Sequence, residues 1–405
     1  MKIVKFILAF VGTGIVLFAL VIGWNWKSFE IFLNNREAFE EGSEWVPKTQ
    51  SLRGLTEYID ENSDKVSVAS IVLEHPDSTL FIKEETPRTL GTISNLFLLT
   101  AYAIEMDDGR FDPNERIQVD EIENYQLPQI NRTLHTDGLR FASNRGWLNG
   151  DGIPLHRALE LLVHFNDPAL ADYLWMKLQP FNWNDFKKRH NLVKTEMPLP
   201  FSGLYIYLSA HEENRDIADL IDERNNLSED NYRQLIFEKA ERFQADSIFR
   251  NEIINRFEDD RLGRSFIQER DALNLFPRGT AKELAYFLQD LWNREKISDA
   301  AAKQIFDWLQ SPYIGRSEIE RDFTRYGALF DNRIGLLNGI DFGTLIYTGE
   351  TKFQAIIFDQ LPVGFWFHMS GNHMHQDFQQ RLIYDPALIE LMEKVADNHP
   401  NSDSN

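Results

Sequence analysis

The residues whose side chains could do chemistry in this sequence are mainly histidines, and their spacing is irregular. Three histidines from His368 to His375, followed by Asp377, offer metal-type ligands, but on a loop such spacing arises more often by chance than as a metal site. His164 stands alone at the end of an apolar helical segment, where a structural role is commoner than that of a displaced catalytic base. We therefore predict no metal site and no cofactor.

The composition excludes several classes of function. The chain has 405 residues and a formal net charge of −21, and a surface of that sign repels the phosphate backbone of nucleic acids. It has no cysteine, which excludes disulfides, thiolate nucleophiles and cysteine zinc sites. Hydrophobic residues make up 43% of the chain, enough to offset the conformational entropy of a compact fold. We expect a folded protein with no nucleic-acid partner.

The first segment of the chain has the features of a membrane helix. No residue from Phe6 to Trp26 is charged, and roughly 20 apolar residues span a bilayer as a helix. Lys2 and Lys5 precede the segment, so the positive-inside rule places the N-terminus in the cytoplasm. A cleaved signal peptide is the alternative, but the apolar run is long for one and residues 23–26 are a poor cleavage site. We predict a single-pass anchor in the cytoplasmic membrane over residues 1–27 and an extracytoplasmic, or periplasmic, remainder.

The rest of the chain is predicted to form a stalk over residues 28–50, a domain over 51–397 and a disordered tail over 398–405. Leu96–Met106 is apolar on nearly every face, which predicts a helix that other elements cover all round. The other segments follow from hydrophobic periodicity and from helix and turn signals. They are a helix after Ser51, strands at Val66–Leu73 and Thr79–Lys83, helices from Pro154 through Leu178, an acidic helical insertion at about 211–276, helices at Thr280–Trp292 and Ser298–Leu309, strands at Phe342–Tyr347, Phe353–Phe358 and Val363–Phe367, and a final helix from Pro386 to Ala396.

This order of elements indicates the architecture. The early hairpin is too small to be stable alone, so it most simply joins the late strands in one antiparallel sheet. We therefore predict an α/β (α+β) fold with a five-stranded antiparallel sheet flanked by terminal helices, plus an all-helical subdomain, preceded by one transmembrane helix.

Three short segments can be compared, in order, with the sequence motifs of a known family. Pro87–Phe97 begins the buried helix, Leu161–Ala169 leads from a loop into another helix, and Asn332–Gly339 lies near the late strands. With these segments in order, the chain resembles the class A β-lactamases over residues 51–396. Members of that family carry Ser-x-x-Lys, Ser-Asp-Asn and Lys-Thr-Gly or Lys-Ser-Gly on the corresponding helix, loop and strand, and share their fold with the penicillin-binding transpeptidases.

The resemblance implies that Thr92 stands at the position of the attacking serine and Asn95 at that of the lysine. In the family, the serine hydroxyl attacks a lactam or D-alanyl amide after it loses a proton to the lysine, or to a glutamate through a water. Threonine keeps the hydroxyl but crowds it, and an amide is no general base. Ser94 is no substitute, because Phe97 follows where a lysine is needed. Near the expected glutamate only Glu196 is found, in a register that suggests a structural place.

The other two segments are substituted as well. Phe165 stands at the serine position, which removes the hydroxyl that would pass a proton to the leaving nitrogen, and Asp167 stands at the asparagine position. Arg333 replaces the lysine, and Gly335 is kept. The guanidinium of Arg333 suits a carboxylate ligand. The alternative, that Arg333 is a surface residue paired with a neighbour such as Asp331, stays equally open.

We therefore predict a membrane-anchored, extracytoplasmic β-lactamase-like protein of the serine hydrolase family that is catalytically impaired, a pseudoenzyme. Its cleft is expected to bind a lactam, a peptidoglycan peptide or another carboxylate-bearing ligand, or an envelope protein. Two alternatives stay open. One is an active β-lactamase or D-Ala peptidase-type hydrolase with Thr92 as nucleophile. The other is a structural protein whose acidic insertion is the partner surface.

Overall fold

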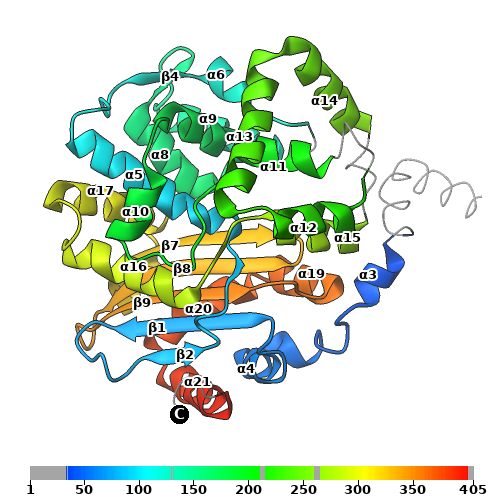
Figure 1. The fold of residues 1–405 in the computed structure, drawn as a ribbon. Helices are drawn as coiled ribbons and strands as arrows, with labels where there is room; N and C mark the ends of the chain where they lie inside the picture. The colour runs from blue at the N-terminus through cyan, green and yellow to red at the C-terminus, as the bar shows by residue number, and fades with distance from the viewer. Residues whose placement is uncertain are drawn as a thin grey trace, which may run out of the picture.

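The computed structural model describes residues 33, 35–128, 130, 132–209, 215–259 and 265–399. At its centre is one antiparallel sheet in the order β2-β1-β9-β8-β7, which brings the first and last strands of the chain together (Figure 1). Val66 of β1 lies opposite Phe358 of β9, and Val72 lies opposite Lys352. The strands are β1 Val66–Val72, β2 Leu80–Ile82, β7 Phe323–Arg333, β8 Leu336–Leu345 and β9 Thr351–Phe358.

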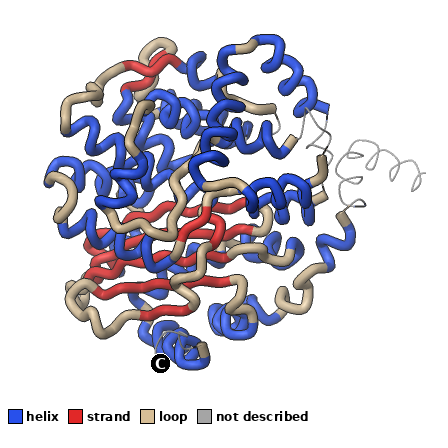
Figure 2. Tube along the Cα trace, viewed as in Figure 1, coloured by secondary structure: helices blue, strands red, loops and turns tan. Residues whose placement is uncertain are grey.

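Side chains of the sheet alternate between two hydrophobic cores, as the period of a strand requires. Ala355 and Ile357 of β9 belong to the core under the helical region, whereas Ile356 and Phe358 belong to the core under the terminal helices. Figure 2 shows helices on both sides of the strands. The terminal helices are α4 Leu52–Glu61, α19 Val363–Gly371, α20 Met374–Tyr384 and α21 Pro386–Asn398.

The helical region covers the other face of the sheet and surrounds α5 (Asn95–Asp107), which is buried from Asn95 to Ala103. An amphipathic helix needs cover on one side only, so the apolar sequence of α5 accounts for its central place. The remaining α-helices of this region are α6 Val119–Glu123, α7 Arg132–Asn144, α8 Leu155–Phe165, α9 Pro168–Leu178, α10 Trp183–Arg189, α11 Phe201–Leu208, α16 Ala281–Asn293, α17 Asp299–Gln310 and α18 Ser317–Asp322.

The acidic insertion is helical in its described parts. The helices α12 and α13 begin at the capping residues Asp216 and Ser228, whose side chains accept backbone N–H groups of the first turn. The insertion contains α12 Ile217–Asn226, α13 Glu229–Ala245, α14 Ser247–Asp259, α15 Phe266–Asp271 and the 3₁₀ turn η3 Ala272–Leu275. In Figure 1, α13 and α14 lie beside α11, and α12 and α15 lie closer to the sheet.

The predicted fold class is wrong in part, because there are further sheets. Two two-stranded sheets pair β3 (Arg88–Thr89) with β6 (Arg278–Gly279), and β4 (Arg116–Gln118) with β5 (Gly152–Pro154). The pair β4 and β5 lies among the helices, so the subdomain is not all-helical. Strands of two or three residues are too short to show a sequence period, which is why the pattern gave no sign of them.

The late strands also differ from those predicted. Residues 363–367 form the start of helix α19, and the edge strand β7 was not predicted. The run Val363–Phe367 has no polar side chain, so it fits a strand as well as a buried helix. However, Trp366 is only 8% exposed whereas Phe367 is 36% exposed, so burial follows helical spacing. In β7 the polar residues at both ends hide the strand pattern.

The predicted transmembrane helix is not part of the described fold. Phe6–Trp26 lies outside the described residues, and no helix among the described ones has the length and hydropathy needed to cross a bilayer. The described part of the predicted stalk packs on the domain: its helix is α3 (Arg36–Glu40), Trp45 packs edge-on against Tyr58 at 5.0 Å, and the Phe266 N–H donates to Oδ1 of Asn35 at 2.6 Å.

Candidate active-site cleft

The three substituted segments meet at one cavity of about 480 Å³. It lies between the helical region and the carboxyl end of β7, beside the start of α5. Thr92, Phe165 and Arg333, one from each segment, line it. Segments that lie far apart in the sequence therefore meet in the fold. Three of the predicted site residues lie outside the lining: Asn95, Asp167 and Gly335.

Thr92 lies in the 3₁₀ turn η2 (Gly91–Ser94) that precedes α5, and a carboxylate from the sheet holds this turn. The backbone N–H of Thr92 donates to Oδ2 of Asp331 at 2.6 Å. Gly91 permits this approach, because its φ is +59° and a Cβ there would lie 1.8 Å from the same oxygen. The Thr92 hydroxyl is buried and has no hydrogen-bond partner among the described residues. Nothing in that part of the chain accepts its proton.

Asn95 is the first residue of α5 and is 2% exposed. Its Nδ2 has no hydrogen-bond acceptor in the described part of the chain, and no side-chain hydrogen bond joins it to Thr92. An amide at this position cannot take up the proton of a nucleophile. The buried amide instead takes part in the packing at the start of the central helix.

Phe165 ends α8 and forms part of the cavity wall where the resemblance places a hydroxyl. Its ring packs against the ring of Phe141, with centroids 5.4 Å apart. The next residue, Asn166, has a left-handed φ of 49°, and its Nδ2 donates to the carbonyl of Phe330 at 2.7 Å. This bond connects the end of α8 to β7 across the cavity. The wall at Phe165 is apolar and offers no proton relay.

Asp167 supports the frame of the helical region. Its Oδ1 accepts the N–H of Ala169 at 3.0 Å, which caps α9, and its Oδ2 lies 2.6 Å from Nδ1 of His135. Both side chains are buried. Burial opposes a charge on the imidazole, but the hydrogen bond and the negative charge of Asp167 outweigh it and raise the pKa of His135 above 6.5.

The raised pKa of His135 predicts a pH dependence of stability. The folded protein binds this proton more tightly than the unfolded chain does. The protonated His135 therefore contributes its full share to the free energy of unfolding below about pH 6.5, and this share is lost as the pH rises through the pKa of His135 in the folded protein. We expect His135→Asn to remove this part of the slope and to cost about 1–3 kcal/mol at low pH. Urea unfolding at stepped pH measures the difference from wild type. The exposed His75→Asn is the control, and a slope unchanged in His135→Asn would contradict the prediction.

Arg333 lines the cavity at the end of β7, and its guanidinium is already engaged. Its Nη1 donates to the hydroxyl of Tyr205 at 2.7 Å, and its Nε lies 3.4 Å from Oδ2 of Asp331 in an ion pair. The guanidinium also lies over the rings of Phe201 and Phe276, at 4.7 and 5.6 Å from their centroids. The pairing with Asp331 that we considered from the sequence is present. A carboxylate ligand would have to share the guanidinium with that residue.

Gly335 has a backbone role. It lies in the tight turn between β7 and β8, where Arg333 pairs with Leu336. Its φ is +83°, and a Cβ there would lie 2.4 Å from Cγ of Arg270. Only glycine fits both requirements.

The other candidates considered from the sequence have structural partners. Ser94 donates to a carbonyl of its own turn at 2.7 Å. His164 lies 2.9 Å from the hydroxyl of Ser311, and burial lowers the pKa of His164 to about 4. Glu196 pairs with Arg224 of the insertion. Across the described ranges, no group of three or more histidine, aspartate or glutamate residues is arranged to hold a metal ion.

Several residues that line the cleft or support its frame were missed. Tyr205 lies inside the apolar run Phe201–Leu208, and His135 belongs to no motif. Asp331 was considered only as a neighbour of Arg333, whereas it is also the acceptor for Thr92. The usable signal was the polar run of residues 331–333 directly after the apolar stretch of residues 326–330, because buried polar groups at a strand end need partners.

The strand order and the cleft between sheet and helical region define the class: the chain has a β-lactamase/transpeptidase-like fold, and the resemblance predicted from the sequence is confirmed at this level. It is similar to a β-lactamase from Chitinophaga pinensis DSM 2588, with 12% identity and a TM-score of 0.50 over 83% of this chain and 99% of that chain. A β-lactamase from Sphaerobacter thermophilus DSM 20745 gives 12% identity and a TM-score of 0.50 over 83% of this chain and 98% of that chain. No family model and no curated protein matches the sequence. At such identities the likeness concerns the fold alone.

Proposed function

We propose that this protein is a catalytically impaired member of the β-lactamase-like serine hydrolases that binds a ligand in its cleft without turning it over. The observation that carries the proposal is the hydrogen bond from the Thr92 N–H to Oδ2 of Asp331 at 2.6 Å. In acyl transfer, free N–H groups beside the nucleophile stabilise the oxyanion that forms. Here a carboxylate occupies the N–H of the candidate nucleophile, and its negative charge would repel a second anion.

The chemistry of proton transfer supports the same conclusion. The Thr92 hydroxyl has no hydrogen-bond partner among the described residues, and Asn95 and Phe165 offer neither a base nor a relay. Asp331 is the carboxylate that contacts this turn, but it bonds the N–H of Thr92 and the N–H of Asn332 rather than the hydroxyl. At the matching positions there is therefore no general base, no proton relay and no free N–H group of residue 92 for an oxyanion.

The cavity is compatible with a bound small molecule. Its volume of about 480 Å³ lies within the range of small-molecule pockets, about 300–1,000 Å³. Its walls are mostly apolar or aromatic, and the charged residues of the lining are Arg333, Asp331 and Glu269. A lactam, a peptidoglycan peptide or a segment of an envelope protein are the candidate ligands. An extracytoplasmic location at the membrane is part of the proposal; it rests on the sequence of residues 1–27 and would be tested by membrane fractionation.

A penicillin test separates the impaired protein from the active alternative. We expect no covalent adduct when the purified protein is incubated with a fluorescent penicillin and run on a denaturing gel, because Thr92 has no activating base. Thr92→Ala should behave like the wild type, and Ser94→Ala controls for the neighbouring hydroxyl. A labelled band that Thr92→Ala abolishes and Ser94→Ala keeps would establish the active hydrolase. Fluorescence anisotropy on the same samples reports binding without acylation.

A further inference from the structure

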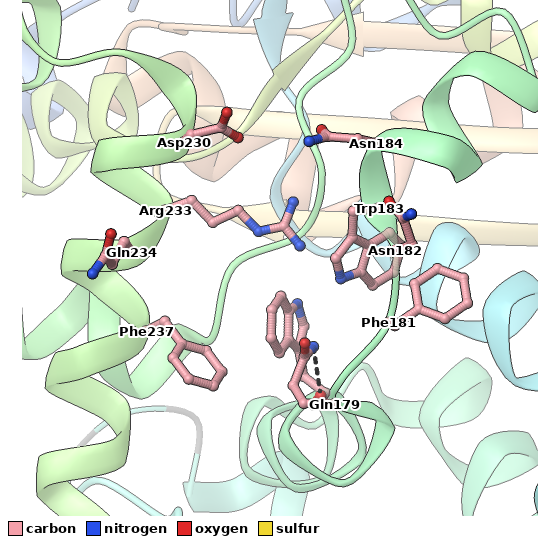
Figure 3. Close-up of a pocket in the computed structure, with 10 residues that line it drawn as sticks. Gln179, Phe181, Asn182, Trp183, Asn184, Asp230, Arg233, Gln234 and Phe237 are labelled. Atoms are coloured by element: carbon pink, nitrogen blue, oxygen red, sulfur yellow. Dashed lines mark hydrogen bonds between the residues drawn. The ribbon is translucent and has the colours of Figure 1, made fainter.

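A second pocket lies between the insertion and the helical region, and it shares no lining residue with the cleft. Its volume is about 320 Å³. Its walls come from the end of α9, the connection to α10 and one face of α13, as Figure 3 shows. The volume falls at the lower end of the range for small-molecule sites.

The helix α13 has two distinct faces. The apolar stripe from Tyr232 to Phe243 is buried against the domain. A second set of residues, spaced three and four apart, lies on one side of the helix and faces the pocket. These are Asp230, Arg233, Gln234 and Phe237.

Arg233 is the central residue of this pocket. Its guanidinium lies 5.4 Å from the ring centroid of Trp175 and 5.4 Å from that of Trp183. Within the described residues it makes no hydrogen bond and no ion pair, and Glu229 on the preceding turn is paired with Lys187 at 2.8 Å. Burial lowers the pKa of Arg233 to about 10, so the side chain stays charged at neutral pH. Its N–H donors are therefore available to a ligand.

The surroundings of Arg233 are rich in donors and apolar surface. Figure 3 shows the indole of Trp183 facing the guanidinium across the pocket. The Nε1 of Trp183 is buried and has no acceptor in the described part of the chain. Phe181 and Phe237 add apolar walls, and Asp230 is the one acidic residue of the lining. Within the described residues, neither the guanidinium of Arg233 nor the Nε1–H of Trp183 has a hydrogen-bond acceptor, although the charge of Asp230 acts on Arg233 from the same lining.

We propose that this pocket binds a monocarboxylate with an apolar body, whose carboxylate pairs with Arg233 and whose body lies against the aromatic side chains. Two N–H groups of a guanidinium match the two oxygens of a carboxylate. A single charge suits the site better than a phosphate, because the chain carries a net charge of −21 and repels multiply charged anions. The contrast with the cleft supports this assignment, since Arg333 is paired with Asp331 and Arg233 is not. The proposal does not depend on the function of the cleft.

Calorimetric titration of the full-length chain with 3-phenylpropionate tests the proposal. We expect saturable binding of 3-phenylpropionate. The neutral analogue 3-phenylpropionamide should bind at least about tenfold more weakly, because the charge-assisted hydrogen bond is lost. Inorganic phosphate should not compete. Equal affinity for acid and amide would overturn the proposal, as would tighter binding of phosphate. These comparisons use the wild-type chain and do not rely on a variant that folds.

Variants then locate the site. Arg233→Gln should weaken binding of 3-phenylpropionate about tenfold or more, and Arg233→Lys, which keeps the charge but loses the planar fork, should fall in between. Arg242→Gln is the matched control, because Arg242 lies on the same helix and stacks on Phe249 instead. Indole NMR of Trp183 should shift on titration in the wild type and not in Arg233→Gln. Unchanged affinity in a folded Arg233→Gln would place the ligand elsewhere and refute the assignment.

Discussion

Replacing Asp331 with alanine should lower the free energy of unfolding by about 3–5 kcal/mol, the usual cost of removing one partner of a buried ion pair. Asp331 is 6% exposed and serves three groups at once. It accepts the N–H of Thr92 at 2.6 Å and that of Asn332 at 2.8 Å, and it pairs with Arg333. Its loss leaves a buried guanidinium without its counter-charge and the turn before α5 without its acceptor.

The controls for this prediction distinguish a buried pair from an exposed one. Asp377→Ala removes an exposed pair with Arg381 on one helix turn, so it should cost less than about 1 kcal/mol. In the double variant of Asp331→Ala with Arg333→Met, the loss should be smaller than the sum of the single losses. Denaturant unfolding measured by circular dichroism gives all four values. Strict additivity would mean that the ion pair does not couple the two residues.

Gly91→Ala should cost about 2–5 kcal/mol or prevent folding. A left-handed residue with a Cβ costs about 1–2 kcal/mol, and overpacking of a rigid site adds about 1–3 kcal/mol. Gly91 has a φ of +59°, and the new Cβ would lie 1.8 Å from Oδ2 of Asp331 and 2.7 Å from Cδ2 of Leu336. The carboxylate would have to leave the Thr92 N–H, which makes the substitution a test of that contact as well.

Gly109 provides a matched control at the other end of the same helix. Its φ is +76°, and a Cβ there would meet no atom within 4 Å. Gly109→Ala should therefore show only the backbone cost of about 1–2 kcal/mol. The difference between the two variants isolates the collision at Asp331. If thermal and urea unfolding gave equal losses for both, the close approach of Gly91 to the sheet would be refuted.

The sequence indicated the architecture where long segments carried a clear period. The buried helix of Leu96–Met106 corresponds to α5, and the run from Val66 corresponds to β1, because a fully apolar face has few alternatives. The prediction was wrong at Val363–Phe367, where a continuous apolar run fits either period. It failed again at β7, whose strand state depends on pairing with β8 rather than on its own residues.

The sequence predicted which segments could meet at a cleft, but not the contacts that hold them there. Thr92, Phe165 and Arg333 line one cavity, because α5 begins beside it and α8 and β7 end beside it. Asn95 and Asp167 were placed by motif position alone and instead serve packing and capping. The contact between Asp331 and Thr92 joins residues far apart in the chain, and no local pattern encodes such a contact.

The place of β1 in the sheet has a consequence for how the chain acquires its structure. β1 pairs with β9, so residues 66–72 cannot take their place in the sheet until residues 352–358 have been synthesised. Pairing between such distant segments slows folding, because the chain between them must lose conformational entropy before the strands make any contact. During synthesis the early hairpin thus exposes an unpaired edge that can associate with other chains.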